Sequence, residues 1–464
     1  MELFLLFAVQ LLDLVGHELL LFAGVWFAVG AVDELAVDCI WLWLWFHGKI
    51  GSRLNVVKAD EPLKGVAAVF VPAWQEAAVV GAMVRHTLLA WPQRELRIYV
   101  GCYRNDPETL AALVAAAPHD PRLRIVVHHH DGPTTKADCL NRLYQALCDD
   151  EHRGGFTARS IILHDAEDMV HPAALALLDR GLDCADFVQL PVRPEPHPAS
   201  QWIAGHYLDE FAESHGKGLV VRDWLKAGIP AAGVGCAFSR RAIRHLAQLR
   251  GANRPFDDNA LTEDYECGLW ITQAGGRGRF LRCRDENGNL IATREFFPST
   301  LYSAVRQKTR WLHGIAFQGW ERLGWSGGPI ELWMRLRDRR GPFTALVMGA
   351  GYLLMLIWPV LLFAEVSGTY QPSPLHGFLR WLLGFNAVML LWRLVFRFVF
   401  TTREYGWRQG LLAVLRTPVA NVIAMMAGRR AVVAYFQTLR GEAVRWDKTD
   451  HRLHPTHIQV SGGS

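Results

Sequence analysis

The sequence predicts an α/β protein in which a mostly parallel, doubly wound sheet is flanked at both ends by membrane and interfacial helices. Short β-rich runs alternate with helical runs between Gly65 and Val192, which is typical of a parallel sheet with crossover helices. Long apolar segments lie before and after this region. Of the 464 residues, 51% are hydrophobic and 20% are charged. This mixture favours a soluble domain joined to membrane helices.

Charge and cysteine content argue against two classes of protein. The net charge of +4 is too small to favour nucleic acid as a partner, and the basic residues beside the apolar segments suit anionic lipid headgroups. The eight cysteines include no C-x-x-C pair. They predict free thiols in a reducing compartment, not a disulfide framework or a zinc site.

Residues 1–48 predict a membrane anchor. The apolar run is interrupted by acids but has no basic leader and no small-residue cleavage site. We therefore expect a retained anchor of one or two helices instead of a cleaved signal peptide. Basic residues follow at once, and by the positive-inside rule they place the next domain, residues 49–325, in the cytoplasm. They are Lys49, Arg53, Lys58 and Lys64.

Five short β-rich runs predict the sheet, and their carboxyl ends should meet at one edge, where open α/β folds bind ligands. The fourth run ends abruptly in Asp165-Ala166-Glu167-Asp168. Mg²⁺ and Mn²⁺ prefer oxygen ligands, usually one or two carboxylates plus substrate phosphates. We therefore predict a metal site with Asp165 and either Glu167 or Asp168, and a solvated acidic turn is the alternative. The runs are residues 66–73, 96–101, 123–127, 160–163 and 187–192.

Residues after the other predicted strands suit a nucleotide. Trp74 and Glu76 follow the first run and could stack on a base and bond a ribose. Asp106 follows the second run and could accept a hydrogen bond from a base N–H. Lys136 opens a predicted helix, where a cation and free backbone N–H groups would meet a diphosphate. Each also has a plainer interpretation, as a core tryptophan, a turn aspartate or a solvated lysine.

A second acidic group is predicted at the start of a later helix. Thr262 is a candidate N-cap for a helix that continues over residues 265–274, so Glu263 and Asp264 lie in its first turn. Acids at this position are also simply good partners of the helix dipole. The helix N-terminus would keep the pKa of Asp264 low, which favours the ionised form that a base needs.

A third group combines an amide, a guanidinium and an indole. Gln307, Arg310 and Trp311 fall at i, i+3 and i+4, on one face of a predicted helix. The trio could clamp a leaving diphosphate and support a sugar. Its alternative role is packing against the membrane boundary.

Taken in order, these groups resemble the D, D-x-D, T/E-E-D and Q-x-x-R-W series of membrane-embedded family 2 glycosyltransferases, such as cellulose, chitin and hyaluronan synthases. The resemblance covers roughly residues 1–450. Two positions depart from it, because Glu167 replaces the usual second aspartate of the metal motif and Gln75 stands where asparagine is common. The matching pieces are Trp74-Gln75-Glu76, Asn105-Asp106, Lys136, Asp165-Ala166-Glu167, Thr262-Glu263-Asp264 and Gln307-x-x-Arg310-Trp311.

The resemblance implies a Rossmann-like GT-A domain and a role for each group. The domain would bind a nucleotide diphospho-sugar, with UDP as the expected nucleotide, and transfer the sugar with inversion. Asp264 would be the general base, with Glu263 beside it, and Arg310 would stabilise the leaving diphosphate. Trp311 would support the acceptor sugar, and the loop that contains Gly235 and Cys236 would contact the acceptor.

The resemblance also implies partners and a location. The acceptor would be a growing glycan, and the product an exopolysaccharide made at the bacterial inner membrane. An outer-membrane export partner and a separate cyclic di-GMP-responsive protein are expected, since longer relatives carry a regulatory module beyond the length of this chain. Two alternatives remain open: single-sugar transfer to a lipid phosphate carrier, and a non-catalytic membrane receptor or scaffold.

The region 326–430 predicts interfacial and transmembrane helices. Residues 343–363 and 379–400 are long enough to span, and the loop between them has no Lys or Arg, so it should face outward. Residues 411–428 contain Arg416 and a proline and predict an interfacial or re-entrant helix. The remainder, residues 431–464, predicts a cytoplasmic tail.

Overall fold

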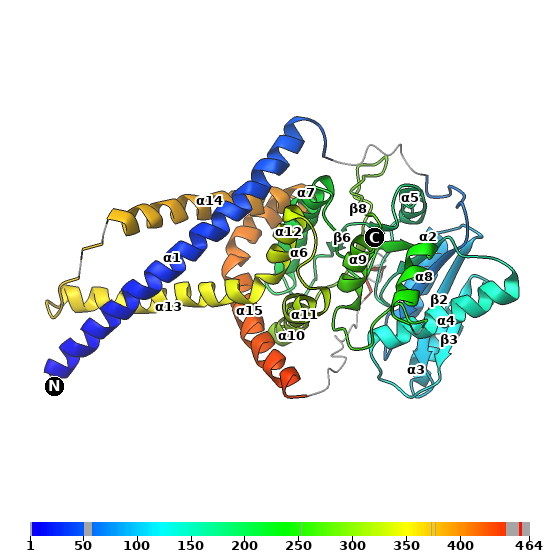
Figure 1. The fold of residues 1–464 in the computed structure, drawn as a ribbon, viewed down its shortest axis with the longest axis horizontal. Coiled ribbons are helices and arrows are strands. Elements are labelled where there is room, and N and C mark those ends of the chain that lie inside the picture. Colours follow the sequence, from blue (N-terminus) through cyan, green and yellow to red (C-terminus); the bar gives the residue numbers. More distant parts are fainter. Residues whose placement is uncertain are drawn as a thin grey trace.

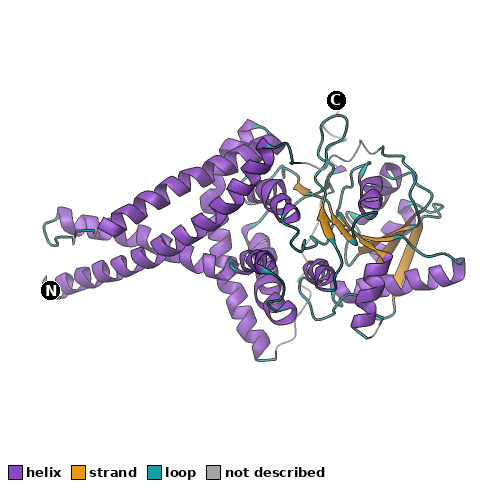
Figure 2. Ribbon diagram, turned by 45° about the horizontal axis from the view of Figure 1, so that its top comes forward, coloured by secondary structure: helices purple, strands orange, loops and turns teal. Residues whose placement is uncertain are grey.

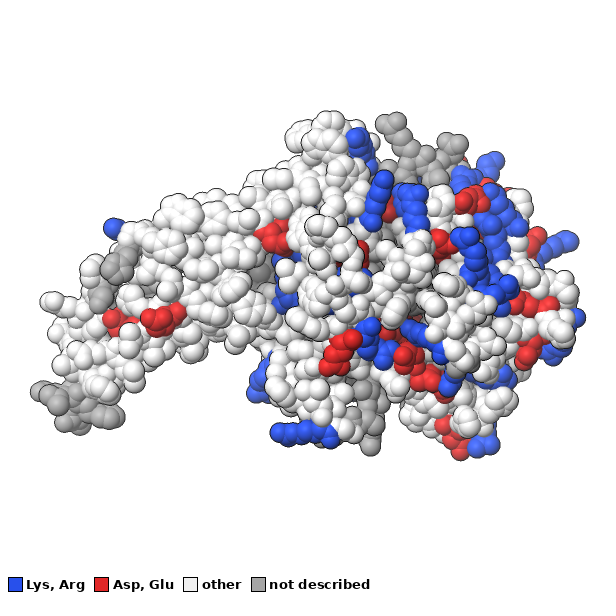
Figure 3. Space-filling model, viewed as in Figure 1, with Lys and Arg blue, Asp and Glu red and all other residues white. Residues whose placement is uncertain are grey.

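A computed structural model describes residues 2–50, 58–251, 253–372, 374–375, 377–441 and 454–456. Figure 1 shows an α/β domain on one side and a bundle of long helices on the other. The space-filling view shows few charged side chains over the outer part of the bundle and many over the α/β domain (Figure 3). The distribution of charge thus matches a membrane region joined to a water-exposed domain.

The sheet of the α/β domain is mostly parallel, as predicted, with strand order β3-β2-β1-β4-β7-β5-β8. β7 runs antiparallel to both β4 and β5, and a two-stranded parallel sheet pairs β6 with β9. The strands are β1 Ala67–Pro72, β2 Leu96–Tyr103, β3 Leu123–His128, β4 Ser160–Leu163, β5 Phe187–Gln189, β6 Val192–Pro194, β7 Cys236–Ser239, β8 Gly278–Phe280 and β9 Thr293–Glu295.

The first four predicted strands are confirmed, and the fifth is corrected. The predicted run over 187–192 is divided into β5 and β6. Pro191 stands between them, and it has no N–H to donate to a sheet ladder. β7 begins in the segment that the sequence analysis treated as a loop.

Helices cover both faces of the sheet (Figure 2). Alternate β1 residues point to opposite faces, so Val69 and Val71 join one buried cluster and Phe70 joins the other. The helices of the domain are α2 Val80–Ala90, α3 Pro107–Ala116, α4 Lys136–Gly154, α5 Ala174–Gly181, α6 Gly205–Glu213, α7 Leu219–Trp224, α8 Arg240–Leu249, α9 Glu263–Gln273, α10 Leu301–Leu312, α11 Gly319–Leu323 and α12 Pro329–Arg339. Two π-helical segments, η1 Ser214–Gly218 and η2 His313–Gln318, extend α6 and α10.

The N-terminal anchor is one helix, α1 Glu2–Phe46. At 1.5 Å per residue its 45 residues extend about 68 Å, more than twice the hydrocarbon thickness of a bilayer. The helix is therefore long enough to cross a membrane and still reach the α/β domain, where Trp41 Nε1 donates to the Gly216 carbonyl at 3.0 Å. This settles the choice between one and two helices.

Among the described residues, four helices are long and apolar enough to cross a membrane: α1, α13 Gly341–Val366, α14 Gly377–Tyr405 and α15 Trp407–Leu439. In both ribbon views α15 runs across the end of α13 and α14 instead of alongside them (Figures 1 and 2). Arg416 of α15 is buried and pairs with Asp209 of α6 at 2.7 Å. These contacts favour the predicted interfacial position, although α15 extends past the predicted end at Gly428 to Leu439.

Candidate active site

A cavity of about 770 Å³ opens at the carboxyl edge of the sheet. It brings together predicted residues from five separate parts of the chain. Those in its lining are Glu76, Lys136, Asp165, Glu167, Glu263, Asp264, Gln307, Arg310 and Trp311. Five other predicted site residues lie outside the lining: Trp74, Asp106, Asp168, Gly235 and Cys236.

The acidic turn after β4 presents two carboxylates to the cavity and buries a third. Asp165 and Glu167 line the cavity, whereas Asp168 has no exposed surface. Asp168 Oδ2 lies 2.6 Å from His164 Nδ1 and accepts from the Asp165 backbone N–H at 3.0 Å. Asp168 is therefore placed to hold the turn that carries Asp165.

Lys136 stands opposite this turn, at the start of α4. The Thr135 hydroxyl accepts from the Asp138 N–H at 3.1 Å and caps the helix. Lys136 Nζ lies 2.6 Å from Asp165 Oδ1. Burial opposes the charge, but the Asp165 carboxylate, with those of Glu263 and Asp264, outweighs it and raises the pKa of Lys136 above its ordinary value. The lysine is therefore a fixed cation in the cavity.

The predicted helix is confirmed as α9, with Thr262 at the N-cap position, but the Thr262 side chain makes no capping hydrogen bond. The expectation of a low pKa for Asp264 is wrong. Burial raises the pKa of Asp264, and the opposing charge of Lys136 does not cancel this effect. For Glu263, burial and the neighbouring Asp264 charge raise the pKa to about 8. At both carboxyl groups, burial therefore raises the pKa more than the dipole of the helix N-terminus lowers it.

Asp264 also lies against the glycine-rich loop before β7. Gly233 has a φ of +79°, and a Cβ at this position would overlap the Asp264 carboxylate. Only glycine combines this backbone conformation with such a close approach at no cost. Gly235, with a φ of +59°, packs in the same way against the Thr293 side chain.

Gln307, Arg310 and Trp311 lie on one face of α10, as predicted, and all three line the cavity. The Trp311 ring lies 6.4 Å from the rings of Phe211 and Phe297. The trio therefore faces the cavity, and Trp311 packs against aromatic side chains of the α/β domain.

Two of the residues predicted to contact the nucleoside, Trp74 after β1 and Asp106 after β2, lie outside the cavity lining, whereas Glu76 lies in it. The Trp74 ring packs edge-on against Tyr103 at 5.2 Å. Asp106 Oδ2 accepts from the Gln75 N–H at 2.5 Å, and Oδ1 accepts from the Thr109 N–H at 3.4 Å. Asp106 thus caps α3 and fixes the loop that carries Glu76, and its contact with a base stays a prediction.

Sequence reasoning missed several cavity residues. Glu295 at the end of β9 lines the cavity, and burial together with the Asp168, Glu167 and Asp165 carboxylates holds its pKa well above the ordinary value. A carboxylate at the end of a short strand was the available signal. Phe211 and Phe297 also line the cavity, and no motif marks them.

The carboxylates at the cavity suit a divalent metal only together with a substrate. Within the described residues, no three His, Cys, Asp or Glu side chains form a metal-binding group. Mg²⁺, however, is usually bound by one or two carboxylates and by substrate phosphates, without a complete protein cage. Asp165 and Glu167 supply two such carboxylates on the wall of one cavity, beside Lys136, so these side chains fit the metal.

The fold of this domain is of the GT-A type found in glycosyltransferases. The model of the glycosyltransferase-like family 2 matches residues 65–314, and the chain belongs to this family and is a glycosyltransferase. It is 35% identical over 452 residues to bacteriophage adsorption protein B of Escherichia coli K12 and equally to bacteriophage N4 adsorption protein B of E. coli O157:H7. Each alignment covers 91% of this chain, which spans about 60% of the length of these relatives.

Among solved structures, the chain is similar to the mannosyltransferase PcManGT from Pyrobaculum calidifontis, which was solved in complex with GDP-Man and Mn²⁺. The TM-score is 0.52 at 16% identity, with 87% of this chain and 99% of PcManGT covered. At this level of identity the likeness concerns the fold alone.

Proposed function

We propose that this chain transfers a sugar from a nucleotide diphospho-sugar to a hydroxyl group of a glycan, with inversion at the anomeric carbon. The observation that supports this most directly is the arrangement of one cavity: Asp264 faces it together with Lys136 and Arg310. A base for the acceptor and cations for the leaving group are thus available in the same space.

In the proposed reaction, Asp264 takes the proton of the acceptor hydroxyl as its oxygen attacks the anomeric carbon. The bond from that carbon to the diphosphate breaks on the opposite face, and its electron pair leaves with the nucleoside diphosphate. Lys136 and Arg310 stabilise the charge that develops there. Burial raises the pKa of Asp264, which makes its carboxylate a stronger base than an exposed aspartate.

Asp165 and Glu167 would hold Mg²⁺ or Mn²⁺, which neutralises negative charge on the departing diphosphate. Between the two alternatives for the second ligand we propose Glu167, because it lines the cavity and Asp168 does not. We also propose that the α/β domain faces the cytoplasm of a bacterium and that the product is an exopolysaccharide. A UDP-sugar is the first donor to test, and GDP-Man, the ligand of PcManGT, is the second.

The test uses the full chain, solubilised in detergent, with a panel of UDP- and GDP-sugars and Mg²⁺ or Mn²⁺. We expect release of nucleoside diphosphate from one donor or a small group of donors, and loss of release in Asp165→Ala and in excess chelator. Absence of release from every donor would contradict the proposed function. Undiminished release in chelator would contradict the metal requirement alone.

A further inference from the structure

Residues 454–456 lie against the acidic turn after β4, residues 165–168. They follow the membrane helices in the sequence, yet His454 has no exposed surface and Pro455 is buried. His454 Nε2 lies 3.1 Å from the Asp168 carbonyl oxygen, across 286 residues of the chain. A residue that follows α15 therefore contacts the turn that carries the proposed metal ligands.

A second contact of the His454 ring shows which of its nitrogens carries the hydrogen. The Thr456 backbone N–H can only donate, and its nitrogen lies 3.2 Å from His454 Nδ1. Nδ1 must therefore accept, and in a neutral imidazole Nε2 is then the donor. The Thr456 hydroxyl, 2.6 Å from Nδ1, can donate to the same atom. His454 thus donates from Nε2 to the Asp168 carbonyl, and Thr456 holds the ring in place.

This hydrogen bond is one of four along a continuous stretch of backbone. The carbonyl groups of residues 168–171 accept from four separate parts of the molecule. The donors are, in order, His454 Nε2, the Arg294 N–H, His86 Nε2 and Trp91 Nε1, at 3.1, 3.0, 2.9 and 3.0 Å. Of these four bonds, that of His454 lies nearest to Glu167.

Asp168 connects the two proposed metal ligands. Its Oδ2 accepts from the Asp165 N–H at 3.0 Å, and its own N–H donates to the Asp165 carbonyl at 3.3 Å. Glu167 is its neighbour in the chain. A shift of the Asp168 backbone would therefore change the position of the Asp165 carboxylate relative to that of Glu167. Groups that orient metal ligands affect metal affinity without touching the metal.

The contact is more specific than the packing of a chain segment on a surface. Burial of a polar ring costs free energy unless the ring is hydrogen-bonded, and both nitrogens of His454 have partners. Pro455 fixes one backbone angle between His454 and Thr456. The ring and the residue that orients it are therefore delivered as one short unit.

We propose that His454 is a positioning residue for the acidic turn: its Nε2–H holds the Asp168 backbone so that Asp165 and Glu167 bind Mg²⁺ or Mn²⁺ together. The inference rests on the proposed function, in which these two carboxylates are the metal ligands. It extends the site to a segment that the sequence predicts only as a cytoplasmic tail.

The experiment measures Mn²⁺ binding by the full chain without turnover. His454→Leu removes the donor, and His454→Gln keeps an N–H at the end of a side chain of similar length. His86→Leu is the matched control, because it removes the same kind of bond from the Val170 carbonyl. The probe is Mn²⁺ with UDP or GDP, whichever the wild-type chain binds.

Three readouts are compared among these variants. The Kd for Mn²⁺ follows from the loss of the electron paramagnetic resonance signal of the free ion. Hydrogen exchange is followed in peptides that contain Asp165 and Asp168. Thermal unfolding in detergent reports overall stability.

We expect His454→Leu to weaken Mn²⁺ binding about 10-fold and to speed hydrogen exchange at the acidic turn. His454→Gln should bring both values back toward the wild type. His86→Leu should keep the wild-type Kd, even if its unfolding midpoint falls as far as that of His454→Leu. If His454→Leu does not fold, His454→Asn takes its place, because its amide is one methylene too short to reach the Asp168 carbonyl.

Three results overturn the inference and leave the proposed function standing. These are a wild-type Kd for Mn²⁺ in His454→Leu or His454→Asn, an equal loss of Mn²⁺ binding in His86→Leu, and no recovery in His454→Gln. A wild-type chain that binds Mn²⁺ but cleaves no donor overturns the proposed transfer and leaves the positioning role standing. Failure of the wild-type chain to bind Mn²⁺ with either nucleotide overturns the metal requirement and the inference with it.

Discussion

His164 Nδ1 lies 2.6 Å from Asp168 Oδ2, and both side chains are buried beneath the turn that presents Asp165 to the cavity. Burial lowers the pKa of His164 to about 4. Burial, with the Asp165 and Glu167 charges, raises that of Asp168. Burial thus disfavours the charged form of both side chains. Asp168 Oδ2 accepts a hydrogen bond from the Asp165 N–H at 3.0 Å. We therefore assign Asp168 the role of supporting the turn and Glu167 the role of the second metal ligand. Substitutions at the two positions can distinguish these roles.

Glu167→Gln should raise the Mg²⁺ or Mn²⁺ concentration needed for half-maximal donor cleavage, because an amide is a weaker metal ligand than a carboxylate. The same substitution should leave the thermal stability near that of the wild type. Asp168→Ala should destabilise the fold by about 1–3 kcal/mol, since it leaves buried polar groups without a partner. Metal titrations and thermal unfolding in detergent measure the two effects. A rise in the metal requirement in Asp168→Asn, and none in Glu167→Gln, would assign the ligand role to Asp168.

Gly233→Ala should nearly abolish sugar transfer, because its Cβ would overlap the Asp264 carboxylate and displace the base. Gly288→Ala is the matched control. Gly288 has a φ of +80°, but a Cβ there would meet no described atom within 4 Å. Both variants place an alanine at a positive φ and so strain the backbone. Only Gly233→Ala also brings a Cβ into contact with the Asp264 carboxylate. Equal transfer rates in the two variants would show that Asp264 does not need this contact.

The sequence predicted those features that local patterns determine. β1 to β4, the helical starts at Lys136 and Glu263, and the shared face of Gln307, Arg310 and Trp311 follow from runs and spacings within a few residues. The resemblance added the roles of these groups. Five of the predicted segments line one cavity, and the roles of their residues stay predictions.

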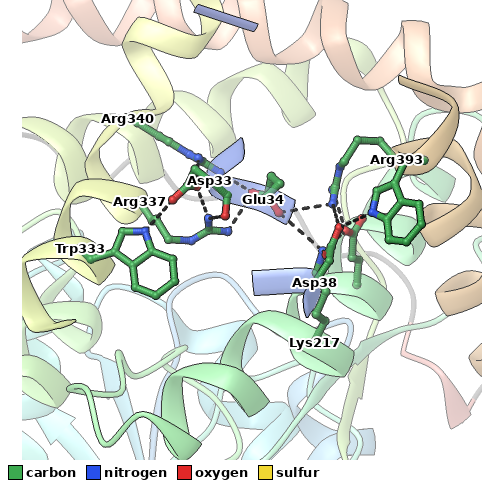
Figure 4. A network of polar contacts seen from close by, with 10 residues as sticks. Asp33, Glu34, Asp38, Lys217, Trp333, Arg337, Arg340 and Arg393 are labelled. Atoms are coloured by element: carbon green, nitrogen blue, oxygen red, sulfur yellow. Dashed lines mark hydrogen bonds and ion pairs between the residues drawn. The ribbon is translucent and has the colours of Figure 1, made fainter. Parts of the chain in front are cut away.

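The remaining features depend on contacts between residues far apart in the chain. Glu34 meets Arg337 and Arg393 across 303 and 359 residues of the chain (Figure 4). A hydrophobic pattern in α1 cannot show which of its acids has a partner. The antiparallel direction of β7 depends on how the chain returns to the sheet. The raised pKa of Asp264 depends on burial by other elements, which the position at a helix start does not disclose.

The orientation of the chain can be tested with an impermeant thiol reagent. Ser367, exposed between α13 and α14, lies in the loop predicted to face outward, so Ser367→Cys should be labelled in intact cells. The cytoplasmic control should be Cys184, which is exposed, and not Cys102, which is buried. Cys184 should be labelled only after permeabilisation. Labelling of Cys184 in intact cells would place the α/β domain outside.

Glu263 should make stability depend on pH. Its pKa rises from 4.5 to about 8 in the folded chain, so the folded state keeps a proton that the unfolded chain has lost between these values. The contribution of Glu263 to the free energy of unfolding is therefore greatest below pH 4.5 and falls as the pH rises through about 8. Thermal unfolding midpoints of Glu263→Gln should decline less between pH 6 and 9 than those of the wild type. The exposed Glu108→Gln serves as the control and should keep the wild-type slope.

The identity of the base gives the most direct test of the chemistry. A carboxylate helps only as the acceptor hydroxyl loses its proton, so Asp264→Asn should slow transfer by roughly 10²- to 10⁴-fold. The amide preserves the size of the side chain, and Lys136 and Arg310 remain in the cavity, so the Kd for the donor should stay near wild type. Glu263→Gln, which alters the adjacent carboxyl group, is the matched control and should retain more activity. The assignment is wrong if Asp264→Asn transfers sugar at the wild-type rate, or if Glu263→Gln is the variant that binds donor but cannot transfer.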